Sequence, residues 1–309
     1  MGGGLSVRRI ARVVLGLAVG LFLTVAVLQL FEAGRIFTVR SYVRLDRAWA
    51  RSFPLDGAKD LVRRLDPVLT RAGLLKPVRV EVEPGVSLLL DPHDDVSRTI
   101  LISVAGRWEP EVWDAIGSGL PEGAVFLDVG AHIGYDTLKA SVKVGREGRV
   151  VAFEPNPNTL TLLRSNVAAS GAANVIVQPI ACTDTDTTLT LFDSTLGGNS
   201  GSSSLSQQNA GSAARTYTVR GRPIDDVVAE LGLKRIDVLK ADVEGAELLV
   251  LRGATETLKR YHPKLVLEEV PRQLANMNTS IEELEAFIKS VGYTTMRQVD
   301  YKNREWTRR

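Results

Sequence analysis

A short apolar stretch that leads directly into a glycine-rich turn restricts the fold of this chain more than any other feature. Ala124–Leu127 is apolar, Asp128 follows it, and Gly130 and Gly134 come next. A pattern typical of a helix begins immediately afterwards. This order predicts a buried strand, a tight turn and a helix N-terminus, where backbone N–H groups are free to bind a ligand.

The turn differs from two common nucleotide-binding motifs. The dinucleotide fingerprint requires three glycines in the order G-x-G-x-x-G, whereas this turn reads D-x-G-x-x-x-G and contains His132. No lysine follows as it does in a P-loop. A carboxylate next to a glycine turn suits a ligand that carries an amino group and a nucleoside, such as S-adenosylmethionine. A glycine needed only for steric reasons is the alternative that this motif by itself leaves open.

Acidic residues stand at the ends of four predicted strands. In chain order, the strands and their acids are 124–127 with Asp128, 148–155 with Glu154, 174–182 with Asp184, and 236–243 with Asp242 and the following Glu244. The carboxyl ends of parallel strands meet at one edge of a sheet, where ligands bind. We therefore expect these acids to surround one crevice.

The other expected elements alternate with these strands. The apolar periodicity predicts helices over 158–170, 248–260 and 281–291, and strands over 187–192, 216–220, 264–270 and 293–298. A glycine- and serine-rich stretch, 193–214, predicts a long loop, and a substrate lid is our functional interpretation of it.

Several motifs resemble those of the FkbM-type methyltransferases. They read D-V-G-A-H-I-G-Y from Asp128, V-V-A-F-E-P-N-P from Val150, D-V-L-K-A-D-V-E-G-A-E from Asp237, V-L-R-G-A from Val250 and W-E-P-E from Trp108. The resemblance covers about residues 78–298. It implies an α/β class I methyltransferase (Rossmann-like) fold with a doubly wound, mostly parallel sheet. It also implies S-adenosyl-L-methionine as the cofactor and methyl transfer, usually to a hydroxyl oxygen.

The resemblance also implies site residues, position by position. The candidate cofactor-binding residues are Asp128, Gly130, His132, Gly134, Glu154, Asp184 and Asp242. The candidate catalytic residues are Asp242, Glu244 and His132, and we favour Asp242 or Glu244 as the base that removes the hydroxyl proton. His132 stands where such proteins often carry Asn, and fixing the loop by a hydrogen bond is its alternative role. For Glu244, the alternative is stabilisation of a helix N-terminus. The acids are compatible with a carboxylate-bound Mg²⁺, but no ligand spacing requires one, so we assign no metal ligands.

The N-terminal region predicts a membrane anchor. Residues 13–31 contain no charged residue and are long enough for one membrane-spanning helix, whereas the core of a cleavable signal peptide is shorter. More arginines follow the stretch than precede it, which favours a single-pass protein with its catalytic domain on the cytoplasmic side. We expect five segments: a basic N-terminus (1–12), a transmembrane helix (13–31), a helical neck (32–76), the methyltransferase domain (77–300) and a basic tail (301–309).

Composition narrows the function further. The formal net charge of +2 gives no reason to expect nucleic acid as a partner, and the single cysteine, Cys182, excludes an intrachain disulfide. The sequence thus predicts a membrane-anchored S-adenosylmethionine-dependent O-methyltransferase that acts on a sugar, lipid-linked or small-metabolite hydroxyl. The alternatives are a catalytically inactive cofactor-binding scaffold at the membrane and a nucleotide-dependent oxidoreductase. The oligomeric state cannot be inferred from the sequence.

Overall fold

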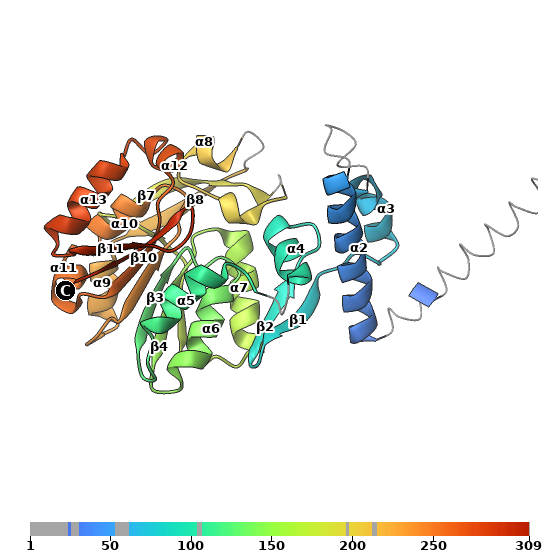
Figure 1. Cartoon of the computed structure of the whole chain (residues 1–309), viewed down its shortest axis with the longest axis horizontal. Coiled ribbons are helices and arrows are strands. Elements are labelled where there is room, and N and C mark those ends of the chain that lie inside the picture. The colour runs from blue at the N-terminus through green and yellow to red at the C-terminus, as the bar shows by residue number, and fades with distance from the viewer. Residues whose placement is uncertain are drawn as a thin grey trace, which may run out of the picture. The chain divides into compact units, whose positions relative to one another are not determined.

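The computed structural model describes residues 24–25, 31–52, 62–103, 107–195, 198–211 and 215–308 (Figure 1). The chain divides into two units. Residues 1–80 and 90–93 form the first unit, and residues 81–89 and 94–309 form the second. Two strands near the boundary, β1 (Val78–Glu83) and β2 (Val86–Leu90), form a two-stranded sheet.

The first unit contains the long helix α2 (Glu32–Ser52), the short 3-10 helix η1 (Arg63–Leu65) and α3 (Asp66–Arg71). The hydroxyl of Tyr42 in α2 donates to the carbonyl oxygen of Val62 at 3.0 Å and also bonds to Asp66. Leu65 in η1 and Val68 in α3 are exposed.

The predicted membrane anchor is wrong. Residues 13–31 lie outside the described residues except for Thr24, Val25 and Phe31. Within the part of the chain that the structure describes, no helix combines the length and the apolar character needed to cross a membrane. The long helix α2 is 21 residues, but it carries five arginines together with Glu32 and Asp46. The predicted single-pass membrane localisation is corrected for the same reason.

The second unit is built on a seven-stranded sheet. Its order is β11 (Thr295–Gln298), β12 (Asn303–Thr307), β10 (Lys264–Glu268), β9 (Val238–Ala241), β3 (Val125–Val129), β4 (Arg149–Phe153) and β5 (Val175–Gln178). The five strands from β10 to β5 are parallel, and β12 runs antiparallel to β10. The expected doubly wound, mostly parallel sheet is therefore confirmed. The chain leaves β3 toward β4 on one side and later returns to β9 on the other, so the strand order switches between β3 and β9.

Alternating residues of the central strands form two apolar cores. Phe126, Val150 and Val238 pack with helices α5 (Pro110–Ser118) and α6 (Tyr135–Val144) on one face. Leu127, Val151 and Leu239 pack on the other face. The helices that contribute to this second core are α9 (Ile224–Glu230), α10 (Glu247–Arg252), α11 (Thr255–Tyr261), α12 (Pro271–Ala275) and α13 (Ile281–Ser290). Burial on both faces explains why these strands appear as continuous apolar runs in the sequence.

Helix α7 (Pro157–Ala169) packs Leu163 against Ala131 and Ala152, on the same face of the sheet as α6.

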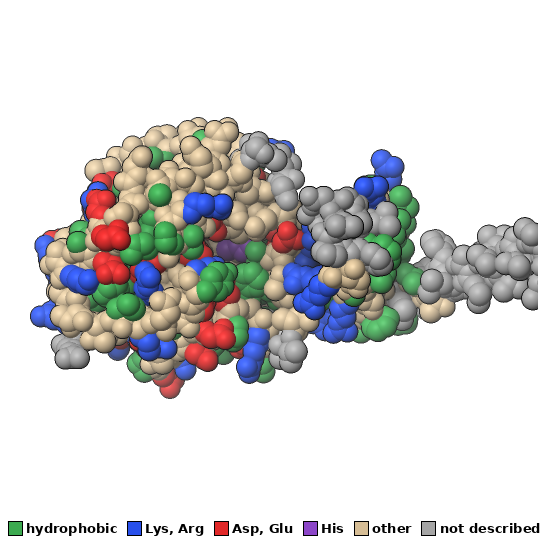
Figure 2. Space-filling model, turned by 45° about the horizontal axis from the view of Figure 1, so that its top comes forward, with side chains coloured by type: hydrophobic (Ala, Val, Ile, Leu, Met, Phe, Trp, Pro, Cys, Tyr) green, Lys and Arg blue, Asp and Glu red, His purple; other side chains and the backbone are tan. Residues whose placement is uncertain are grey.

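A separate three-stranded sheet has the order β6 (Ala181–Cys182), β8 (Arg215–Arg222) and β7 (Thr187–Asp193). The remaining helices are α4 (Asp95–Ile102), the 3-10 helix η4 (Ser200–Ser202) and α8 (Gln207–Ala210). In the view of Figure 2, acidic and basic side chains are interspersed over the visible face of the larger part of the molecule.

The structure differs from the expected elements in several places, of which two concern helix α10 and the C-terminus. The expected helix over 248–260 is split into α10 and α11 at Gly253, where a Cβ atom would lie 2.0 Å from the carbonyl oxygen of Thr183. The expected basic tail contains the strand β12, whose Trp306 is 2% exposed. The tail is thus part of the sheet rather than an appendage.

Candidate active site

The turn after β3 has the backbone that its glycines predicted. Gly130 has a φ of +81°, and a Cβ atom there would lie 1.9 Å from the carbonyl oxygen of Asp242. Gly134, with a φ of +93°, directly precedes α6. His132 also has a positive φ, 52°, which is uncommon for a residue other than glycine. Only glycine fits at position 130, because the turn passes directly over the end of β9.

Glu154, at the end of β4, holds this turn in place. One carboxylate oxygen accepts the backbone N–H of His132 at 2.8 Å, and the other accepts the N–H of Asn156 at 2.9 Å. Burial raises the pKa of Glu154 to about 7, although the two hydrogen bonds favour the ionised form. Each carboxylate oxygen has a second lone pair, so Glu154 can still accept a hydroxyl of a ligand.

Two cavities meet at the carboxyl edge of the sheet. The smaller, of about 70 Å³, is lined by Glu154 and by Cys182, the buried cysteine. The larger, of about 420 Å³, is lined by Trp108, Lys302 and other residues. Five residues line both cavities: Gly130, His132, Gly201, Asp242 and Glu244. Two ligands bound in these cavities would therefore face each other across Asp242 and Glu244.

A buried lysine at the end of β9 gathers three carboxylates. The Nζ atom of Lys240 lies 3.2 Å from a carboxylate oxygen of Asp136 and 3.8 Å from oxygens of Asp128 and Asp242. Burial raises the pKa of Asp128 to about 6, against the opposing effect of Lys240. Burial also acts to raise the pKa of Asp242, but the positive charges of Lys240 and Lys302 outweigh it, so this pKa is lowered.

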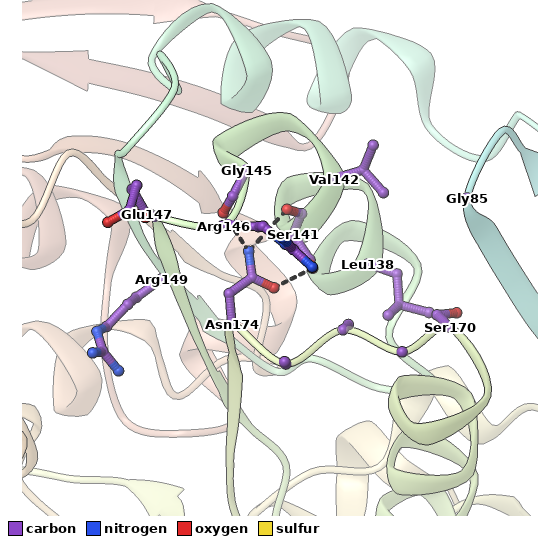
Figure 3. A pocket seen from close by; sticks show the side chains of 14 residues that line it. Gly85, Leu138, Ser141, Val142, Gly145, Arg146, Glu147, Arg149, Ser170 and Asn174 are labelled. Carbon is purple, nitrogen blue, oxygen red and sulfur yellow. Dashed lines mark hydrogen bonds between the residues drawn. The ribbon is translucent and has the colours of Figure 1, made fainter.

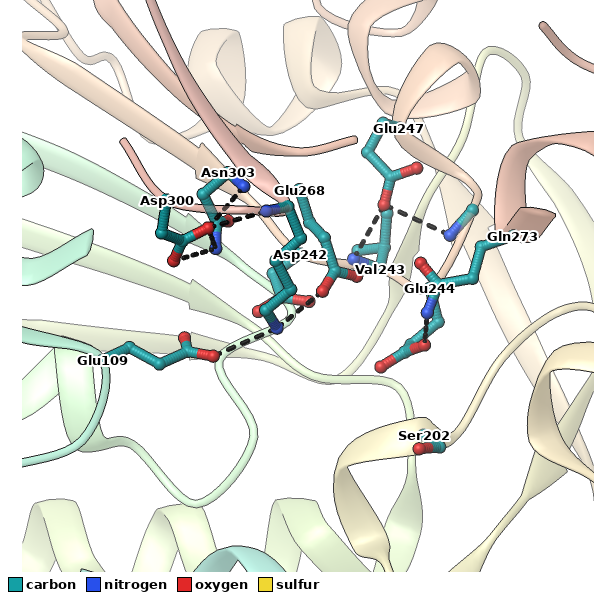
Figure 4. Close-up of polar contacts among 12 residues, drawn as sticks. Glu109, Ser202, Asp242, Val243, Glu244, Glu247, Glu268, Gln273, Asp300 and Asn303 are labelled. Carbon is teal, nitrogen blue, oxygen red and sulfur yellow. Dashed lines mark hydrogen bonds and ion pairs between the residues drawn. The ribbon is translucent and has the colours of Figure 1, made fainter. Parts of the chain in front are cut away.

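A second group of charges lies beside Asp242 (Figure 4). The Nζ atom of Lys302, just before β12, lies 2.7 Å from Glu268 and 3.0 Å from Glu109. Burial and the nearby Asp242 raise the pKa of Glu268 to about 9 and that of Glu244 to about 8. Glu244 and Glu268 are thus mostly protonated at neutral pH, whereas Asp242 is ionised.

The glycine- and serine-rich segment lies over both cavities. Ser200 donates to a carboxylate oxygen of Asp94 at 2.7 Å and lies 2.6 Å from the Nε2 atom of His132. Because the single hydroxyl proton of Ser200 is used on Asp94, its oxygen accepts from His132, which therefore carries its proton on Nε2. Burial lowers the pKa of His132 and keeps the ring neutral. His132 thus joins the glycine turn to the glycine- and serine-rich segment.

The expected site residues do not all reach the cavities. Gly130, His132, Glu154, Asp242 and Glu244 line at least one of them. Asp128, Gly134 and Asp184 do not. Asp128 is completely buried, accepts a hydrogen bond from Thr137 at 2.5 Å and lies 3.8 Å from Lys240, which lines the larger cavity. A Cβ atom at Gly134 would lie 2.7 Å from Leu163, and Asp184 is exposed.

Sequence reasoning missed five charged residues of the larger cavity: Glu109, Asp136, Lys240, Glu268 and Lys302. Four of them stood in or beside recognised segments. Glu109 belongs to the W-E-P-E motif, and Asp136 directly follows the D-V-G-A-H-I-G-Y motif. Lys240 interrupts an apolar strand, and Glu268 ends one. A charge inside a buried strand is a usable signal, because such a charge needs a partner. Nothing in the local sequence marked Lys302.

A third cavity, of about 550 Å³, is larger than these two but is a weaker candidate for the functional site (Figure 3). Arg149 and Asn174, which begin or precede β4 and β5, place it at the amino edge of the sheet, opposite the ligand-binding edge. Asn174 already bonds to Ser141 and to the carbonyl oxygen of Gly145. We therefore assign function to the two cavities at the carboxyl edge.

The chain is similar to known methyltransferases. The chain is 30% identical over 168 residues to the methyltransferase sdnD of Sordaria araneosa, covering 45% of this chain and 63% of that protein. It is 29% identical over 153 residues to the hexuronic acid methyltransferase AglP of Haloferax volcanii, covering 50% of this chain and 59% of that protein. It thus spans less than two thirds of the length of either relative.

A crystal structure of the methyltransferase FkbM from Methylobacillus flagellatus aligns with a TM-score of 0.43 at 20% identity, over 84% of this chain and 64% of that one. The family model of the methyltransferase FkbM domain matches residues 128–295, which include the glycine turn, Glu154, Asp242, Glu244 and Glu268. That match covers more than half of the sequence, so this chain belongs to the FkbM methyltransferase family.

Proposed function

We propose that this protein transfers a methyl group from S-adenosylmethionine to a hydroxyl oxygen of a sugar or another polyhydroxylated small molecule. The observation that carries the proposal is the junction of the two cavities at Asp242 and Glu244. One cavity contains Glu154, an acid at a strand end that can accept the ribose hydroxyls of a cofactor, and the other is lined by charged groups suited to a polar acceptor. The hexuronic acid specificity in the name of one relative supports a sugar as the acceptor.

The residues of the smaller cavity fit S-adenosylmethionine. Glu154 can accept ribose hydroxyls, the turn at Gly130 lets backbone approach the ligand, and Pro155, Ile180 and Leu191 offer apolar contacts to a base. The volume of about 70 Å³ is far below the roughly 300–1,000 Å³ of typical ligand pockets. Segment Ser200–Leu205, which lines the cavity, must therefore move when the cofactor binds.

When bound, S-adenosylmethionine supplies an electrophilic methyl group. The protein's part is to align the acceptor oxygen in line with that methyl group, to exclude water and to accept the hydroxyl proton. Asp242 is the residue that we propose as proton acceptor. It lines both cavities and is ionised at neutral pH, whereas Glu244 is mostly protonated and can instead donate a hydrogen bond to the acceptor.

Label transfer tests this proposal. The full-length protein should transfer tritium from methyl-labelled S-adenosylmethionine to a hydroxylated acceptor in a panel of sugars, uronic acids and small metabolites. The variant Asp242→Asn should lose transfer to the same acceptor while it still binds S-adenosylhomocysteine. Binding of the cofactor without transfer to any member of a broad panel would favour the inactive scaffold. Binding of NAD in place of S-adenosylhomocysteine would favour the oxidoreductase.

A further inference from the structure

Three carboxylates from two neighbouring strand ends converge in the larger cavity. Asp242 follows β9, Glu244 stands in the next turn, and Glu268 ends β10. One carboxylate oxygen from each lies within 4.8 Å of the others. Figure 4 shows Asp242 and Glu268 next to each other, with Glu244 held by Gln273 nearby. The arrangement offers oxygen ligands around one point.

Glu268 supplies a second and independent observation. Its side chain is only 2% exposed, and its Oε1 atom pairs with Lys302 at 2.7 Å. Its Oε2 atom is buried and has no hydrogen-bond partner among the residues that the structure describes. A buried carboxyl oxygen without a partner is costly. A cation in the cluster would supply the missing partner.

The charge balance of the larger cavity points the same way. Among its described lining residues are five acids, Glu109, Asp136, Asp242, Glu244 and Glu268, and two lysines, Lys240 and Lys302. The lysines are already engaged, because Lys240 lies closest to Asp136 and Lys302 bridges Glu109 and Glu268. The five acids thus outnumber the two lysines by three, and a divalent cation could take the place of the protons that Glu244 and Glu268 otherwise hold.

We propose that Asp242, Glu244 and Glu268 bind one divalent cation through their carboxylate oxygens. Ligand sets made only of oxygen select hard cations such as Mg²⁺, Mn²⁺ and Ca²⁺. Opposite oxygens around Ca²⁺ are about 4.6–5.2 Å apart and those around Mg²⁺ about 4.0–4.2 Å. The three carboxylate oxygens lie within 4.8 Å of one another, so they are close enough to share one such cation.

The role of this cation rests on the proposed function, whereas its binding does not. An acceptor hydroxyl that coordinates the cation becomes more acidic and is held at the junction of the cavities. As its oxygen bonds to the methyl carbon and the carbon–sulfur bond breaks toward sulfur, its proton passes to the oxygen of Asp242 that does not face the cation. The cation thus orients the acceptor and assists the loss of its proton.

The test uses full-length protein freed of metal by a chelator and titrated with Mn²⁺, with binding followed by the electron paramagnetic resonance of free Mn²⁺. We expect one Mn²⁺ per chain, displaced by Mg²⁺ or Ca²⁺. Glu268→Gln and, separately, Glu244→Gln should weaken binding by about 10- to 100-fold or more. Glu256→Gln, on an exposed part of α11, is the matched control and should leave binding unchanged.

S-adenosylhomocysteine binding is measured on the same samples. If wild-type protein binds S-adenosylhomocysteine but no Mn²⁺, the cation site does not exist. The same conclusion follows if both variants bind Mn²⁺ as tightly as wild type does. Mn²⁺ binding that depends on Glu268 in a protein that does not bind S-adenosylhomocysteine would confirm the cation site and contradict the proposed function.

Discussion

The ammonium group of Lys240 lies 3.8 Å from a carboxylate oxygen of Asp128, at the ends of adjacent parallel strands. Lys240 is 7% exposed and Asp128 is completely buried. The pair joins the two strands between which the strand order switches. This contact, with those to Asp136 and Asp242, supplies positive charge beneath the site.

Lys240→Met should destabilise the protein strongly, because it leaves buried carboxylates without their shared cation. Breaking a buried ion pair by removing one partner costs about 3–5 kcal/mol. The free energy of unfolding from urea denaturation at pH 7 measures the effect. Lys259→Met removes an exposed lysine of α11 and should change stability by less than about 0.5 kcal/mol. Equal effects of the two substitutions would contradict this account of Lys240.

Asp242→Asn and His132→Asn should affect turnover very differently. If Asp242 accepts the hydroxyl proton, its replacement lowers kcat by about 10²- to 10⁴-fold while S-adenosylhomocysteine binding stays nearly unchanged. His132→Asn should keep most of the activity, because Asn tolerates the positive φ and the histidine only fixes the loop. A loss of turnover in His132→Asn as large as that in Asp242→Asn would make His132 the base instead.

Ser200→Ala should speed cofactor binding. The segment that lines the smaller cavity is held by bonds from Ser200 to Asp94 and His132, and these must break if the cavity is to open. One hydrogen bond contributes about 1 kcal/mol, so the association rate should rise roughly fivefold. Stopped-flow fluorescence with S-adenosylhomocysteine gives this rate, and Ser290→Ala on exposed α13 is the control. An unchanged rate in Ser200→Ala would mean that the segment does not limit entry.

We predict that Glu247 makes the folding stability of the protein depend on pH. Its side chain is 1% exposed, its Oε1 atom accepts the N–H groups of Val243 and Gly245, and burial raises its pKa to about 7. The unfolded chain releases this proton near pH 4.5, so the folded state holds it longer. The stabilising contribution is full below about pH 4.5 and is lost as the pH rises through about 7.

Glu247→Gln cannot lose that proton, so its stability relative to wild type should improve between pH 5 and pH 9. The shift from a pKa of 4.5 to about 7 corresponds to roughly 3 kcal/mol. Thermal unfolding of both proteins across this range gives the comparison. A difference between them that does not change with pH would show that Glu247 titrates as it does in the unfolded chain.

The central strands could be predicted because a short stretch of sequence marks each of them. Each central strand is an apolar run such as Val125–Val129, and the glycine turn at Gly130 requires a backbone that few other residues adopt. The strand β12 was missed because it carries charged residues at Arg304 and Glu305, which are partly buried beside the antiparallel neighbours of the sheet. A strand that is mostly polar, like β12, gives a weak signal in a single sequence.

The site could be predicted only in part, for a related reason. Glu154 and Asp242 follow apolar strands, and strand ends meet at one edge. The contribution of Lys302 depends on the β11–β12 hairpin, which brings it to Glu268 from 34 positions away in the sequence. Asp184 follows the same rule but is exposed, because the expected strand 174–182 is divided into β5 of the main sheet and β6 of the small sheet.

The most direct test of the account is calorimetric titration of the full-length protein with S-adenosylhomocysteine, with NAD in parallel, followed by the same titration of Glu154→Gln. We predict saturable one-to-one binding of S-adenosylhomocysteine, no binding of NAD, and affinity at least about tenfold weaker in Glu154→Gln, since a charged hydrogen-bond acceptor contributes about 1.5–3 kcal/mol. A folded protein that does not bind S-adenosylhomocysteine, or that binds it equally well without the carboxylate of Glu154, would contradict the assignment of the smaller cavity to the cofactor.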